Sequence, residues 1–138
     1  MRKKLIILIV VILVVLAVLL KVLSGDGKVK ADLTDVDEAT GKTQISELEI
    51  IYKNKLPFEM ILEVSSDSED IFNTTYGVVK SIVDTVKLKN SNDPISLTKN
   101  GLSLELKANV ESEGFTYPKD YSQEKMKTYL KEQGWNVR

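Results

Sequence analysis

An unbroken apolar run near the start of the chain is the feature that most constrains it. The run extends over sixteen residues from Leu5 to Leu20, LIILIVVILVVLAVLL. Lys21 follows the run, and its long aliphatic side chain can place the ammonium group among the polar headgroups. The next two residues, which are apolar, can therefore extend the hydrophobic segment to Leu23. As a helix, Leu5 to Leu23 would rise about 28 Å, close to the roughly 30 Å of a bilayer core. We therefore expect residues 1–23 to be a membrane anchor, with the lipid bilayer as a partner.

The charges beside this run predict its orientation. Arg2, Lys3 and Lys4 precede it with no acidic residue among them, so the positive-inside rule keeps the amino terminus in the cytoplasm and the remaining chain outside. A cleaved signal peptide is the alternative, because it also has a basic start and an apolar centre. The run is longer than such a centre usually is, and no Ala-x-Ala follows it. A retained single-pass anchor in the cell membrane is therefore the preferred interpretation.

The rest of the chain has the size and composition of one exported domain. We expect residues 24–28, Ser-Gly-Asp-Gly-Lys, to be a flexible linker, and residues 29–138 to form a single extracytoplasmic β-rich domain. All 20 acidic residues follow residue 23, whereas four of the 19 basic residues do not. A mildly acidic surface with scattered lysines argues against nucleic acid as a partner.

The chain contains no cysteine and no histidine. The absence of cysteine excludes disulfides, thiolate metal ligands and thiol nucleophiles. The absence of histidine removes the commonest general base and metal ligand. We therefore predict a protein that is not an enzyme, with no catalytic, cofactor-binding or metal-binding residues and no cofactor.

Alternation of apolar and polar residues predicts several antiparallel strands. An Asn100-Gly101 step between two of them predicts a hairpin, because both residues tolerate positive φ. The expected strands cover residues 28–37, 44–54, 58–64, 95–98 and 102–110. In the second and third of these strands, the side chains expected in the core are Leu48, Ile50, Tyr52, Phe58, Met60, Leu62 and Val64.

Two segments after the first strands have helical features. In Tyr76 to Lys89 the apolar residues recur with helical spacing, but β-branched residues dominate, and we interpret the segment as a strand with a helix as the alternative. Asp120 or Ser122 can cap a helix over about Tyr121 to Glu132. Trp135 follows that helix and is expected to seal the core against it; stacking on a ligand is the alternative role.

One acidic stretch resembles a cation site, although we prefer a structural explanation. Asp35, Asp37 and Glu38 lie just before Gly41 and could hold calcium. They match no complete calcium-binding loop, and acidic residues are common in solvated turns. We therefore expect a turn at this position.

Two further patterns could carry hydrolytic chemistry. Ser-x-x-Lys occurs at Ser96 and at Ser122, as in penicillin-recognising enzymes, but the companion motifs of those enzymes are absent. A helix cap explains Ser122 better. Glu59 and Glu63 share one strand face and could form the carboxylate pair of a glycoside hydrolase. Solvent-facing strand positions explain them better, because nothing near them in the sequence would raise a pKa.

About half of the chain, residues 44–110, resembles a known family. LEIIYKNKLPFEMILEV, Leu48 to Val64, resembles the strand, turn and strand of the type-2 late embryogenesis abundant proteins, the water-stress and hypersensitive response group. ISLTKNGLSLELKANV, Ile95 to Val110, is similar to the later hairpin of that family. The resemblance implies an immunoglobulin-like antiparallel β-sandwich with a helix, carried in many prokaryotic members on one membrane helix. It also implies a role in stress tolerance without catalysis.

These patterns together predict a mainly β protein, an antiparallel β-sandwich with a C-terminal helix, preceded by one N-terminal transmembrane helix. The expected function is a membrane-anchored extracytoplasmic module with a non-catalytic binding, scaffolding or stress-protective role and a protein partner at the cell surface. The alternative is an accessory subunit of a membrane or cell-surface assembly, such as a secretion, pilus or motor complex. The apolar run disfavours it, because its only small residue is Ala17 and tight helix packing in membranes uses small residues.

Overall fold

The computed structural model describes residues 26–138, so the predicted anchor and the start of the predicted linker lie outside the described residues. Within the described part of the chain, no helix is long and apolar enough to cross a membrane. The first strand begins at Gly27, inside the range expected to be a linker. The elements follow the order β1 (Gly27–Val36), β2 (Thr43–Lys53), β3 (Leu56–Ser66), α2 (Glu69–Lys89), β4 (Ser96–Asn100), β5 (Ser103–Asn109), α3 (Gln123–Glu132) and β6 (Asn136–Val137).

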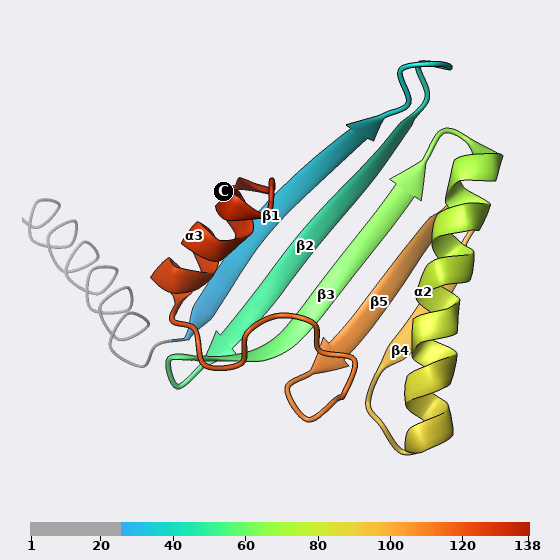
Figure 1. Ribbon diagram of the computed structural model, residues 1–138. Helices are drawn as coiled ribbons and strands as arrows, with labels where there is room; N and C mark the ends of the chain where they lie inside the picture. Colours follow the sequence, from blue (N-terminus) through green and yellow to red (C-terminus); the bar gives the residue numbers. More distant parts are fainter. Residues whose placement is uncertain (1–25) are drawn as a thin grey trace, which may run out of the picture.

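All six strands form one antiparallel sheet with the order β4-β5-β3-β2-β1-β6 (Figure 1). Two successive hairpins place β1, β2 and β3 side by side. The chain then passes through α2 to β4 at one edge and returns as β5 beside β3. After α3, the short β6 pairs with β1 at the opposite edge.

Both helices pack against the same face of this sheet. Successive strands align their apolar side chains in rows across that face, and two-layer burial of this kind is a common way to build a single core. Burying a Leu, Ile, Val or Met side chain contributes about 1.5–3 kcal/mol. One such row contains Ala31, Leu48, Leu62 and Leu106. The same core cluster includes Val83 and Val86 of α2 together with Met126 and Leu130 of α3.

The prediction of a mainly β, antiparallel fold with a C-terminal helix is confirmed, but the predicted sandwich is wrong. Among the described residues the strands form a single sheet, and the layer that covers it consists of helices. The difference arises from the segment 76–89, which we interpreted as a strand and which belongs to α2.

The helix α2 forms because its apolar residues make a stripe that the sheet can bury. Phe72, Val83 and Val86 are buried on that stripe, and the burial outweighs the mild preference of β-branched residues for strands. Ser68 caps the helix by accepting a hydrogen bond from the backbone N–H of Ile71 at 3.3 Å. Acidic residues in the first turn and lysines in the last complement the helix dipole.

The β2–β3 hairpin corrects one predicted core residue. Asn54 and Lys55 form a tight turn, with φ angles of 53° and 69°, the left-handed values that a two-residue hairpin loop requires. The register shifts by one residue beside Tyr52, which pairs with Pro57. Phe58 is therefore the extra residue of a β-bulge, and its side chain is 37% exposed instead of buried.

The C-terminal half agrees with the prediction more closely. The predicted β4–β5 hairpin is present, and Gly101 turns it with a φ of 59°. Its loop is one residue later than predicted, because Asn100 pairs with Ser103 as the last residue of β4. Ser122 caps α3 by accepting a hydrogen bond from the N–H of Lys125 at 3.2 Å, which confirms its interpretation as a cap. Trp135 is partly buried and packs against the core, as expected.

We predict that Phe72→Ala destabilises the protein by about 3–5 kcal/mol, because it removes a buried aromatic ring and leaves a cavity. Phe72 is fully buried under α2. The measurement is urea unfolding followed by circular dichroism. Val78→Ala is the control, because Val78 lies on the same helix with 58% exposure and should change stability by less than about 0.5 kcal/mol. Equal losses in the two variants would contradict the burial of the α2 stripe.

Candidate functional site

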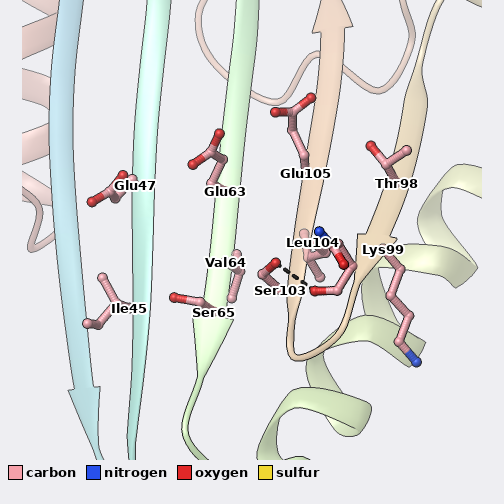
Figure 2. A pocket seen from close by; sticks show the side chains of 11 residues that line it. Ile45, Glu47, Glu63, Val64, Ser65, Thr98, Lys99, Ser103, Leu104 and Glu105 are labelled. Carbon is pink, nitrogen blue, oxygen red and sulfur yellow. Dashed lines mark hydrogen bonds between the residues drawn. The ribbon is translucent and has the colours of Figure 1, made fainter.

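The face of the sheet opposite α2 and α3, here called the open face, carries the most distinctive polar arrangement. Asp32, Glu47, Glu63 and Glu105 pair in register on β1, β2, β3 and β5. We call these four residues the acidic row. Opposed residues on neighbouring antiparallel strands have Cβ atoms about 4.5–5.5 Å apart. Figure 2 shows the three glutamates lying side by side on successive strands.

Basic side chains neutralise the ends of the acidic row. Arg138 Nε lies 3.2 Å from Asp32 Oδ2, and Lys107 Nζ lies 3.3 Å from Glu105 Oε1. Within residues 26–138, neither Glu47 nor Glu63 forms an ion pair. The centre of the row therefore carries uncompensated negative charge.

This crowding perturbs the titration of Glu63. Desolvation by the surrounding side chains raises its pKa above the usual value of a glutamate, and a hydrogen bond with Glu105 raises it further. Repulsion from Glu105, Glu47 and Glu49 acts in the same direction. Neighbouring carboxylates disfavour each other's ionised form, so Glu63 retains its proton to a higher pH than an isolated glutamate would.

Two shallow hollows flank the centre of the acidic row, and Glu47 and Glu63 line both of them. The larger hollow measures about 390 Å³ and extends over Ser65 toward the edge strand β4. The smaller measures about 220 Å³ and extends toward Arg138. In Figure 2, Lys99 points away from the row toward α2, where its ammonium lies 4.9 Å from the centre of the Tyr76 ring.

The carboxylate pair considered from sequence does not form. Glu59 and Glu63 both face the open side of β3, but they are four residues apart along an extended strand, which places their Cα atoms about 13 Å apart. The carboxyl groups of glycosidases are separated by about 5–9.5 Å. The close pair is Glu63 and Glu105, which sequence analysis missed because the two residues lie on strands that α2 and β4 separate.

The other sequence candidates have structural roles. Asp37 shapes the β1–β2 turn by accepting hydrogen bonds from Ala39 N at 3.0 Å and Thr40 Oγ1 at 3.1 Å. Ser96 and Lys99 are three residues apart on β4, so their side chains point to opposite faces and cannot act together. Among the residues that the structure describes, no three acidic side chains converge as metal ligands do.

The buried carboxylate of Asp93, which lies outside the open face, connects the segments that flank β4 and β5. Asp93 is 2% exposed, and its carboxylate accepts hydrogen bonds from Ser112 Oγ, from Ile95 N at 2.9 Å and from Glu113 N at 3.0 Å. Burial alone would raise the pKa of Asp93, but these hydrogen bonds and the charge of Lys87 outweigh burial and lower it. Asp93 therefore joins the segment before β4 to the segment after β5.

Comparison with known proteins identifies no relative. No family model, curated protein or solved structure matches the chain. The resemblance of residues 44–110 to the type-2 late embryogenesis abundant proteins therefore stays a prediction, and the sandwich that it implies is not the arrangement of these strands.

We predict that Asp93→Asn destabilises the protein at neutral pH, because an amide cannot accept all of the hydrogen bonds that the carboxylate accepts. The folded-state pKa of Asp93 is lowered. Its stabilisation is therefore complete above the unfolded-state pKa and is lost as the pH falls toward the folded-state value. Thermal unfolding of the unmodified protein and of Asp93→Asn should be compared across acidic pH. The difference in stability between the two should shrink as the pH falls.

The matched control for this measurement is Asp84→Asn, which removes the same charge. Asp84 is exposed and pairs with Lys80 on the surface of α2 at 2.7 Å, and such surface pairs contribute little. A loss of stability as large as that of Asp93→Asn would contradict the structural role of Asp93.

Proposed function

We propose that the chain is a single-pass membrane protein that displays a non-catalytic binding module outside the membrane. In this proposal residues 1–23 are a retained transmembrane helix with a cytoplasmic amino terminus. The open face of the module binds a positively charged segment of a partner protein at the cell surface. The observation that carries the proposal is the uncompensated charge of Glu47 and Glu63 at the centre of the acidic row.

The acidic row is costly for the isolated fold. Directly opposed like charges on neighbouring strands destabilise a sheet, by an amount comparable to the roughly 0.2–1 kcal/mol that a favourable cross-strand pair contributes. The pKa of Glu63 is raised mainly by desolvation, then by its hydrogen bond with Glu105, and also by this repulsion. A cationic partner would relieve the repulsion, so binding would stabilise the ionised row.

The shape of the open face suits an extended basic segment. Glu47 and Glu63 lie between the two hollows. Lys30 and Arg138 already line the smaller hollow, so a partner's lysine or arginine would approach the pair through the larger one. An arginine can also bind one carboxylate through two parallel hydrogen bonds. The net negative field of the row would speed association with such a partner at low ionic strength.

The apolar run and its flanks support the proposed placement of the module. Leu5 to Leu23 has the length of one bilayer crossing, and the residues before it are basic. The first strand begins only four residues after Leu23, so the module would lie close to the outer surface of the membrane.

A reporter fused after Arg138 tests the topology in cells. We expect alkaline phosphatase, which is active outside the cytoplasm, to be active at this position, because the positive-inside rule keeps only the amino terminus inside. A cytoplasmic reporter such as β-galactosidase should be inactive at the same position. The reverse result would contradict the proposed placement.

A lysine-rich synthetic peptide tests the binding surface. We expect Glu47→Gln combined with Glu63→Gln to weaken binding of an oligolysine peptide by about tenfold, because about 1.4 kcal/mol of charge attraction is lost. Isothermal titration at low ionic strength measures the affinity of the full chain in detergent. Affinity should also rise with pH through the titration of Glu63, because the peptide favours the ionised carboxylate.

The control variant removes two charges from the helical side of the molecule. Glu124 and Glu132 on α3 are exposed, and Glu124→Gln combined with Glu132→Gln changes the net charge equally. If both double variants reduce the affinity for the peptide to the same extent, the effect depends on total charge, and the open face is not the binding surface.

A further inference from the structure

The tip of the β2–β3 hairpin combines exposed apolar and basic side chains. Leu56 is 50% exposed and Phe58 is 37% exposed. Lys53 and Lys55 are also exposed beside them, and Lys53 Nζ lies 4.0 Å from the centre of the Phe58 ring. We call these four residues the hairpin tip. Apolar groups rimmed by lysines are the composition of sites that lie at a membrane surface.

The hairpin tip is hydrogen-bonded to Asp26, the first residue that the structure describes. The backbone N–H of Asn54, within the turn, donates a hydrogen bond to Asp26 Oδ1 at 3.1 Å. Asp26 follows Leu23 by three residues, and three residues span at most about 11 Å. The pairing of Gly27 with Tyr52 holds the start of β1 at the same end of the sheet. The tip therefore lies beside Asp26, which follows the last residue of the apolar run by three positions in the sequence.

We propose that the hairpin tip is a second membrane contact, at which Leu56 and Phe58 insert among the lipid headgroups of the outer surface. Lys53 and Lys55 contact the phosphates of anionic lipids at this site. The proposal rests on the proposed function, because it requires residues 1–23 to cross the bilayer. The tether holds the tip at high effective concentration near the surface, so two apolar side chains suffice for a contact that a free domain would not maintain.

This second contact restricts how the module stands on the membrane. One tether alone allows the sheet to swing, whereas a tether and a hairpin at the same end direct the strands away from the bilayer. The acidic row lies farther along the strands from the tip, so its carboxylates stay clear of anionic lipid and remain open to a partner.

The opposite end of the sheet provides a matched control position. Leu102 is 38% exposed and lies in the β4–β5 turn, where its carbonyl accepts a hydrogen bond from Ser66 N at 3.1 Å. Ser66 ends β3 and Leu56 begins it, so Leu102 lies about 33 Å from the hairpin tip at 3.3 Å per strand residue.

The test uses the full chain in vesicles of phosphatidylcholine and phosphatidylglycerol. The chain has no cysteine, so Leu56→Cys and Leu102→Cys each carry one environment-sensitive fluorophore. We expect the label at 56 to shift its emission to shorter wavelength and to lose fluorescence when spin-labelled lipid is added, while the label at 102 does neither. Adding Lys53→Gln and Lys55→Gln to the Leu56→Cys protein should reduce the quenching at 56.

Circular dichroism checks that each labelled protein is folded, and Phe58→Cys repeats the measurement if Leu56→Cys does not fold. An alkaline carbonate wash followed by flotation separates the two proposals. If the chain stays in the vesicles while both labels are equally exposed to water, the hairpin contact is overturned alone. If the wash releases the chain, the proposed anchor fails and the hairpin contact fails with it.

Discussion

The structure depends on the burial of one face of a single antiparallel sheet. The strands align their apolar side chains in rows, and α2 and α3 complete the core from the same side. Each helix alone would be only marginally stable, because most helical stability in proteins comes from packing an apolar stripe. The sheet and the helices therefore stabilise each other through the shared core. The same one-sided packing leaves the other face of the sheet available for polar groups.

The two faces of the sheet explain why the buried carboxylate of Asp93 and the exposed acidic row differ in their surroundings. Asp93 lies on the buried side, where its hydrogen bonds satisfy the carboxylate and connect two loops. Gly114 lies in the same cluster, against Ile95, where any larger residue would collide. Glu47 and Glu63 lie on the open side, where solvent partly screens their repulsion. The buried carboxylate of Asp93 is fully hydrogen-bonded, whereas Glu47 and Glu63 form no ion pair among the described residues.

Sequence patterns predicted those elements whose signals are local. Alternation located the strands, and the Asn100-Gly101 step and the Ser122 cap located a hairpin turn and a helix start. The sandwich was wrong because the α2 segment is rich in β-branched residues, and only its burial against the sheet decides in favour of a helix. The acidic row was missed for a related reason. Opposition of Glu63 and Glu105 depends on strand pairing across a helix. Alternation within one strand predicts the face on which a residue lies but not which residue of another strand opposes it.

The β-bulge at Phe58 determines which side chains of β3 face solvent and which face the core. Counted directly from the two-residue turn, Glu47 would oppose Leu62, whereas the bulge places Glu63 there. A strand shifted by one position exchanges its two faces completely. Deleting a single residue from the hairpin would therefore expose the apolar side chains of β3 to solvent and place its carboxylates in the core. Only an insertion or deletion of an even number of residues in this hairpin keeps the apolar side chains of β3 on the core face. The bulge therefore fixes which residues of β3 face the helices and which face solvent.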